Sequence, residues 1–160
     1  TGLCWLRQGE QHRWTRAIDG QWPVTGALQV VAQAQAAPTR VRVEVAVADL
    51  VRLAKRAVAA AETKADGFRL TVESAMVALS GSSSRGAYGG REFDGVIEAK
   101  GSHANRVVVT VSPFALKELA DILAKVTTVG VLSVGDSRDP VVLSGGDPVV
   151  ELLMLPVVTS

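Results

Sequence analysis

The residue types that most often carry catalysis or hold metals are scarce in this chain. The only histidines are His12 and His103, and the only cysteine is Cys4. Neither histidine has a cysteine or a carboxylate at a spacing typical of metal ligands. Asp136 and Asp147 lie in expected turns, where Asp is favoured because its carboxylate bonds to the backbone. We therefore expect a binding protein with no metal, no cofactor and no catalytic residues.

Three of the segments that combine serine and glycine could suggest chemistry, and none has the pattern of a catalytic or phosphate-binding loop. Residues 82–86, Ser-Ser-Ser-Arg-Gly, lack the Gly/Lys/Ser pattern that cradles a phosphate. Ser80-Gly81 and Ser144-Gly145 occupy equivalent positions of a repeat, which structure explains better than a nucleophile does. A small hydrolase on an unrelated α+β fold stays an alternative, and a screen for esterase or phosphatase activity would test it.

Composition favours one β-rich domain. Of the 160 residues, 48% are hydrophobic and only 4% are aromatic, so the core must consist chiefly of Val, Leu and Ala. Valine favours strands because its branched side chain suits a pleated surface. The 17 basic and 16 acidic residues give a net charge of +1, which argues against binding nucleic acid by bulk charge.

The sequence favours a cytoplasmic protein. A lone cysteine cannot form an internal disulfide, so nothing requires an oxidising compartment. No apolar run reaches the roughly 18 residues that a membrane-spanning helix needs, and no leader is evident. We therefore expect no membrane partner.

The chain contains an internal repeat. A shift of 64 positions places residues 45–48 on 109–112, 68–72 on 132–136, and 77–81 on 141–145 without a gap. Such self-similarity predicts two copies of one structural unit.

Periodicity assigns the same elements to both halves. Polar and apolar residues alternate over 40–47, as in a half-buried strand, and then recur at helical spacing. The first half is expected to contain a strand at 40–47, a helix at 50–64 that Asp49 caps and Gly67 ends, strands at 68–72 and 76–80, the second of which Gly81 ends, and a last strand at 92–99.

The second half is expected to repeat this order. Pro113 suits the first turn of a helix because it has no amide hydrogen to leave unpaired. The expected elements are a strand at 106–111, a helix that Gly130 ends, and strands at 131–134, 141–143 and 149–156; the apolar stripe of the helix is Phe114, Leu116, Leu119, Ile122, Leu123 and Val126. Two β-α-β-β-β units that share one core predict an α+β domain with a pseudo-twofold axis and two adjacent helices packed on antiparallel sheets.

This order of elements resembles the building block of DNA sliding clamps. Residues 16–23, RAIDGQWP, look like the segment that joins the second and third domains of a bacterial DNA polymerase III beta clamp. Residues 111–116, VSPFAL, resemble the start of its last helix, and residues 153–157, LMLPV, resemble its C-terminus. The first domain and most of the second have no counterpart, and the Arg-Leu that often closes the family's chain is missing after Val157.

The resemblance implies a division of the chain. Residues 1–38 would supply the terminal strands of a preceding clamp domain, at 3–7 and 12–18, plus a linker. Residues 39–160 would form the C-terminal clamp domain, with halves 40–99 and 104–157.

The resemblance also implies a groove that binds the linear peptide motifs of DNA polymerases, repair proteins and the clamp loader. Its alternative is that the C-terminal leucines are strand core and the proline merely ends a strand. Carried over position by position, the groove residues are Pro23, Leu28, Phe114, Arg138, Pro140, Leu153, Leu155, Pro156 and Val157.

In a clamp the helices line the central hole and meet double-stranded DNA, which only a ring surrounds. We expect a homodimeric ring from a full-length chain, and a monomer or a non-ring assembly from this chain alone. A stand-alone adaptor or decoy that binds replication proteins is the alternative function, and a solvated helix face is the alternative for the cations. The cations implied to face DNA are Arg52, Lys55, Arg56, Lys64, Lys117 and Lys125.

Overall fold

The computed structural model describes residue 29 and residues 41–63, 66–83 and 92–157 with their side chains, and the backbone of residues 3–8 and 11–16. The last two segments are β1 (Leu3–Gln8) and β2 (Gln11–Arg16), which form an antiparallel hairpin. The two strands predicted near the N-terminus are therefore confirmed, with bounds that differ by one or two residues.

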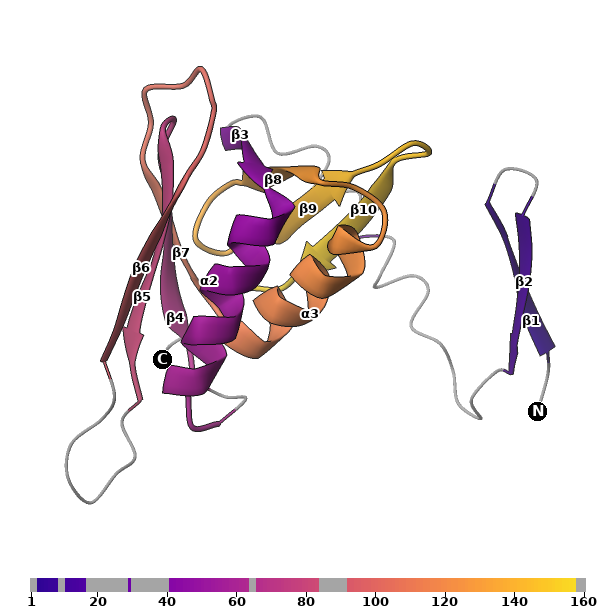
Figure 1. Ribbon diagram of the computed structural model, residues 1–160, viewed down its shortest axis with the longest axis horizontal. Coiled ribbons are helices and arrows are strands. Elements are labelled where there is room, and N and C mark those ends of the chain that lie inside the picture. Colours follow the sequence, from indigo (N-terminus) through magenta and orange to yellow (C-terminus); the bar gives the residue numbers. More distant parts are fainter. Residues whose placement is uncertain are drawn as a thin grey trace.

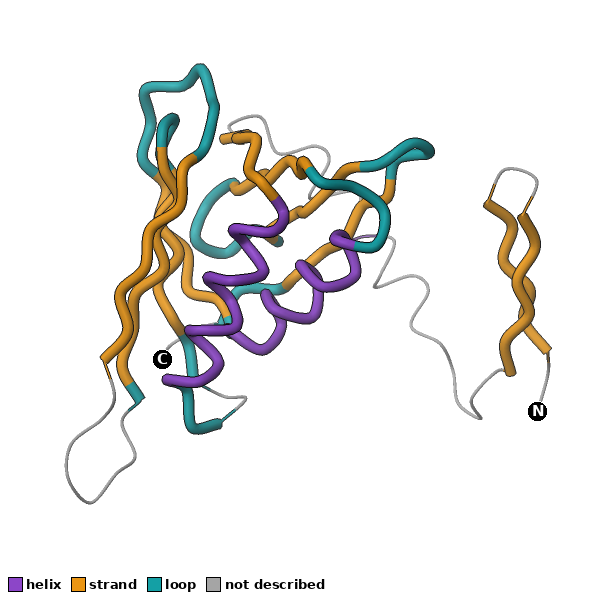
Figure 2. The backbone as a smooth tube through the Cα atoms, in the orientation of Figure 1, coloured by secondary structure: helices purple, strands orange, loops and turns teal. Residues whose placement is uncertain are grey.

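The rest of the described chain forms two helices and two antiparallel sheets (Figures 1 and 2). Each sheet has four strands, in the orders β10-β9-β8-β3 and β6-β5-β4-β7. The elements are β3 (Val41–Ala46), α2 (Val47–Ala60), β4 (Phe68–Val72), β5 (Met76–Ser82), β6 (Glu92–Glu98), β7 (Val107–Val111), α3 (Pro113–Ala124), β8 (Val129–Val134), β9 (Val141–Gly145) and β10 (Val150–Met154).

The two halves of the chain exchange their first strands. β3 pairs with β8 of the second half, and β7 pairs with β4 of the first half. Exchanging the halves converts one sheet order into the other, so the predicted pseudo-twofold duplication is confirmed. The helices pack side by side, with the β4–β7 sheet on the left and the β8–β10 strands on the right in Figure 1.

The predicted constant offset of 64 is wrong in detail. The helices start at Val47 and Pro113, which are 66 positions apart. In the sheets, Leu70 pairs with Leu79 and Leu132 pairs with Leu143, so β4 and β8 are offset by 62 and β5 and β9 by 64. The offset falls from 66 to 62 because α3 and its connection to β8 are together four residues shorter than α2 and its connection to β4. It rises to 64 because the hairpin from β8 to β9 is two residues longer than that from β4 to β5.

Helix α2 begins and ends earlier than predicted. Its N-cap is Ala46, so Asp49 lies in the first turn, where its charge still favours the positive end of the helix dipole. The helix ends at Ala60, and Gly67 lies well beyond it. Just past the helix, the Asp66 carboxylate accepts hydrogen bonds of 2.9 Å from the backbone N–H groups of residues 62 and 63. This local bonding satisfies the chain in a turn rather than in another helical turn.

Helix α3 begins at Pro113, as predicted, but ends at Ala124. Gly130 does not end the helix, because it lies inside β8. A Cβ atom there would lie 2.7 Å from Leu123 Cδ2, so a glycine lets the helix approach the strand. The predicted apolar stripe is too wide: Leu116 and Leu123 are buried with Pro113 and Ala120, whereas Ile122 and Val126 are exposed.

The β4–β7 sheet carries an aromatic stack. The Phe68 ring is fully buried and stacks on the Phe93 ring at a centroid distance of 6.1 Å. The Arg56 guanidinium lies over the other ring, 5.6 Å from the Phe93 centroid. Gly81, which was predicted to end a strand, lies inside β5. A Cβ atom at Gly81 would lie 2.5 Å from Phe68 Cδ1, so the glycine makes room for the ring.

Replacing Gly81 with Val should destabilise the domain by about 1–3 kcal/mol, because the added methyl groups force the Phe68 ring out of its position. Ser82→Ala, at the next and exposed position of β5, is the control and should change stability by less than about 0.5 kcal/mol. Chemical denaturation measures both. Equal stabilities for Gly81→Val and the parent chain would contradict the close contact.

Replacing Arg56 with Ala should lower the free energy of unfolding by about 0.5–1 kcal/mol, the usual strength of a cation–π contact at an exposed site. Lys55→Ala removes an exposed charge from the same helix and serves as the control. If the two variants unfold at the same denaturant concentration, the contact between Arg56 and Phe93 contributes nothing.

Candidate functional site

The segment that follows β10 runs from one sheet to the other. Val141 pairs with Met154, so continuing the register places Pro140 opposite Leu155. The chain then passes Pro156, and the backbone N–H of Val157 donates a hydrogen bond of 2.8 Å to the Thr110 carbonyl in β7. The C-terminal residues thus connect the edge of the β8–β10 strands to the end of β7, where α3 begins.

An exposed leucine occurs on this segment. Leu155 is 65% exposed, although leucine usually lies inside a domain. Leu153 is half-buried in β10 and pairs with Val142, and Pro156 and Val157 are also half-buried. The alternative that these leucines are strand core fits Leu153 better than Leu155.

The structure brings some of the predicted groove residues together. Leu155, Pro156 and Val157 are consecutive, and the strand register places Pro140 beside them. Phe114 is half-buried in the first turn of α3, which follows β7 directly. Arg138 is exposed in the turn before Pro140. Two more predicted groove residues lie outside the described part of the chain: Pro23 and Leu28.

An extended peptide could bind at this place. β10 is the edge strand of its sheet, and a strand at an edge presents backbone groups to a partner. Exposed and half-buried apolar side chains beside such an edge provide contacts for the apolar anchors of a linear motif.

The cations predicted to face DNA lie in several different environments. On α2, Lys55 is exposed, Arg52 forms an ion pair with Asp49, and Arg56 lies over Phe93. On α3, the Lys117 Nζ lies 2.7 Å from the Asp121 carboxylate, and Lys125 is exposed at the C-cap. Lys64 lies outside the described residues. The helix surface therefore carries cations, but at least two of them have an acidic neighbour.

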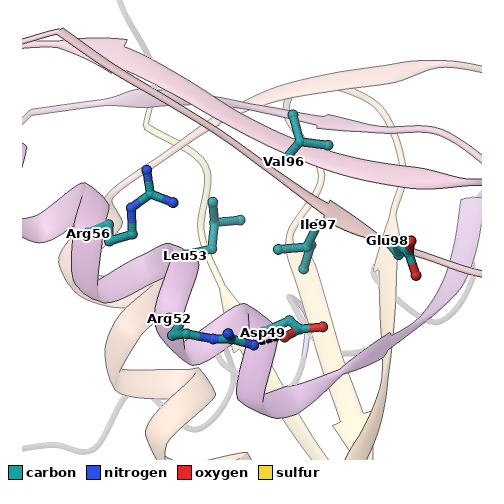
Figure 3. A pocket seen from close by; sticks show the side chains of 7 residues that line it. All are labelled: Asp49, Arg52, Leu53, Arg56, Val96, Ile97 and Glu98. Atoms are coloured by element: carbon teal, nitrogen blue, oxygen red, sulfur yellow. Dashed lines mark hydrogen bonds and ion pairs between the residues drawn. The ribbon is translucent and has the colours of Figure 1, made fainter.

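A groove lies between helix α2 and strand β6 (Figure 3). It has a volume of about 300 Å³, and in Figure 3 the side chains of Arg52 and Arg56 lie along its helix side. The strand side includes Val96, which is 59% exposed. The lining residues are Asp49, Arg52, Leu53, Arg56, Val96, Ile97 and Glu98.

Sequence reasoning did not identify this groove. One signal was present: Glu92, Asp94, Val96 and Glu98 alternate along β6 and are all exposed, so a valine stands in a row of acids. This interruption of the acidic row was the one local feature on the strand side of the groove that the sequence offered.

The described residues contain neither a metal-binding cluster nor a membrane-spanning helix. No group of three or more His, Cys, Asp or Glu side chains in the described ranges could hold a metal ion. Neither described helix is both long enough and apolar enough to cross a membrane.

No protein-family model matches the chain, and no curated protein sequence matches it. Solved structures do match. They include the DnaN sliding clamp (DNA polymerase III subunit beta) of Bartonella birtlesii bound to griselimycin, with a TM-score of 0.67 and 14% identity over 98% of this chain and 41% of that one. The DNA polymerase III beta subunit of Thermotoga maritima has a TM-score of 0.66 and 16% identity over 98% of this chain and 39% of that one. The DNA polymerase III beta subunit of Pseudomonas aeruginosa has a TM-score of 0.69 and 12% identity over 98% of this chain and 40% of that one.

The chain thus spans about two fifths of the length of the clamps that it matches. At these identities the comparison establishes architecture, and it agrees with the strand exchange and the paired helices described above. This chain has the fold of a DNA sliding clamp.

Proposed function

We propose that this chain is part of a processivity clamp whose C-terminal domain, residues 39–160, binds linear peptide motifs of DNA polymerases, repair proteins and the clamp loader. The observation that carries the proposal is the exposed Leu155 beside an edge strand, next to Pro140 and Pro156. Residues 1–38 would be the end of a preceding clamp domain and a linker. No step of catalysis is part of this function.

The peptide would bind in an extended conformation. Its backbone would lie along the edge that β10 leaves open, and its Leu or Phe anchor would pack on Leu155 and Val157, with Phe114 at the helix start. A groove of this kind needs few polar side chains, because the backbone of the edge strand makes the hydrogen bonds to the peptide. The apolar anchors of the peptide provide the selectivity.

We further propose that DNA passes the helix side of the domain when a ring exists. Lys55 and Lys125 are exposed there, and the acidic neighbours of Arg52 and Lys117 keep the local charge low. A few phosphate contacts give binding of about 10⁻⁴ M or weaker at physiological salt. A closed ring, which we expect to be a homodimer of full-length chains, would retain DNA by enclosure and so tolerates such weakness.

For the peptide, Leu155→Lys should weaken binding of a labelled Gln-Leu-x-Leu-Phe peptide by about 2 kcal/mol or more, because it removes an apolar contact and adds a charge. Fluorescence anisotropy, with the chain titrated into the high micromolar range, measures the affinity. The matched control is Val149→Lys, since Val149 is 66% exposed but lies in the turn at the other end of β10. Loss of binding in both variants, or in neither, would remove the groove assignment.

For DNA, retention of duplex on the chain should fall as salt rises, with a log–log slope of roughly −0.9 per phosphate contacted. Changing Arg52, Lys55 and Arg56 together to Ala should weaken retention and flatten that slope. The control changes three exposed cations on the sheets, Arg42, Arg69 and Lys100, to Ala and should leave both unchanged. Salt-sensitive retention that survives the helix changes would show that the helices do not face DNA.

A further inference from the structure

Three exposed valines gather where helix α3 ends. Val126 follows the helix, Val129 begins β8 and Val149 precedes β10, and their exposed fractions are 47%, 53% and 66%. Continuing the β8–β9 and β9–β10 registers places Val129 and Val149 on either side of Gly146. A Cβ atom at Gly146 would lie 3.6 Å from the Val126 Cβ. The three valines therefore surround one glycine, and we call them the valine patch.

The valine patch is held in place by hydrogen bonds. The backbone N–H of Val126 donates to the Leu123 carbonyl at 3.0 Å, and the Thr127 hydroxyl donates to the Val129 carbonyl at 2.9 Å. Gly146 has a φ of +91°, a conformation that glycine adopts without strain, and this bends the β9–β10 turn. Single exposed valines are common, but apolar side chains that lie together at a surface often mark a contact with another molecule.

The other half of the chain shows that the fold does not require these valines. The offset is 66 between the helices and 62 between β4 and β8. It is 57 between β6 and β10, because Phe93 and Val150 pair with equivalent glycines of β5 and β9. The positions equivalent to the valine patch hold Ala60, Gly67 and Glu92, so the same backbone accepts small or charged residues there.

Two opposite charges accompany the valine patch. Lys125 is exposed at the C-cap of α3, directly before Val126, and Asp147 is exposed in the β9–β10 turn, next to Gly146. Neither is in an ion pair with another residue of the described ranges. The patch thus carries one cation on its helix side and one anion on its turn side.

We propose that two copies of this chain form a twofold dimer through the valine patch. In a twofold contact the same surface serves both partners, so the valines of one copy pack on those of the other. Lys125 of each copy then meets Asp147 of the other, which forms two opposite-charge pairs. The occupant is a second copy because the patch carries both members of that pair and is apolar between them.

The contact should be weak and independent of peptide binding. A standard interface has about 20–30 residues on each side, and the valine patch with its two charges is much smaller. We therefore expect association only as concentration rises. Val149 and Leu155 lie at opposite ends of β10, so the dimer leaves the proposed peptide site open.

Charge reversal tests the contact in sedimentation velocity over a concentration series of the 160-residue chain. Lys125→Asp or Asp147→Lys alone should weaken association about tenfold or more, because both charge pairs then become like-charge pairs. The double variant in one chain should regain association, and so should an equimolar mixture of the two single variants, because each aspartate again meets a lysine.

Val149→Lys tests the apolar part of the contact, and it should also weaken association because it buries a charge among valines. Its control is Ala104→Lys, at an exposed position of the connection between β6 and β7, which should associate like the parent chain. Val149→Lys also keeps the proposal testable if a charge-reversal variant fails to fold.

Four results would overturn the proposal: a parent chain that stays monomeric at about 1 mM, a single charge variant that associates like the parent, a double variant as weak as the single ones, or equal association of Val149→Lys and the parent. Peptide binding measured on the same samples separates this proposal from the proposed function. Peptide binding by a monomeric chain rejects the dimer alone, and association without peptide binding rejects the proposed function alone.

Discussion

The strand exchange between the two halves of the chain is the constraint on which the rest of the structure depends. β4 and β8 lie inside their sheets, and each needs a neighbour from the other half to satisfy one row of backbone groups. An unsatisfied backbone group that is buried costs about 1–3 kcal/mol, and in each four-stranded sheet one row of these bonds is made by a strand of the other half. The duplication is therefore not two small domains in a row but one core built jointly.

The exchange also positions the helices. β3 runs directly into α2 at Val47, and β7 reaches α3 after Ser112 alone, so placing these strands in opposite sheets sets the start of each helix. The two helices then pack against each other, and each buries leucine and alanine side chains: Leu50 and Ala54 on α2, and Leu116 and Ala120 on α3. Small residues at such a contact let helix axes approach closely. The lysines and arginines of the helices lie on the part of the helix surface that does not contact the other helix. Arg52 and Lys117 there have a carboxylate neighbour, and Arg56 lies over a ring of the sheet.

The sequence predicted the strands well because their signal is local. Val41, Val43 and Val45 alternate with polar residues, and all three are buried. The two ends of α2 were predicted poorly, because Asp49 and Gly67 fit only the general preferences for a helix start and a helix stop. The helix instead begins at Val47, directly after β3, and the hydrogen bonds of the Asp66 carboxylate form a turn before Gly67 is reached. The exchange itself leaves no local pattern, since alternation tells which face of a strand is buried but not which strand lies beside it. The C-terminal residues proposed to bind a peptide were named from the resemblance alone. The α2–β6 groove was not predicted, because its lining comes from separate elements.

In a duplicated fold, different side chains can be compared at equivalent backbone positions of the two halves. Equivalent backbone positions hold Phe68 and Gly130, Arg56 and Ile122, Glu98 and Leu155. At the first pair the difference is absorbed inside the domain: Phe68 requires Gly81 across the hairpin, and Gly130 admits Leu123. At the other two pairs the side chains are exposed, although the Arg56 guanidinium also lies over the Phe93 ring of the core. Differences inside the domain are therefore explained by packing. The packing of the domain does not require the apolar side chain of Leu155, which is 65% exposed near β10.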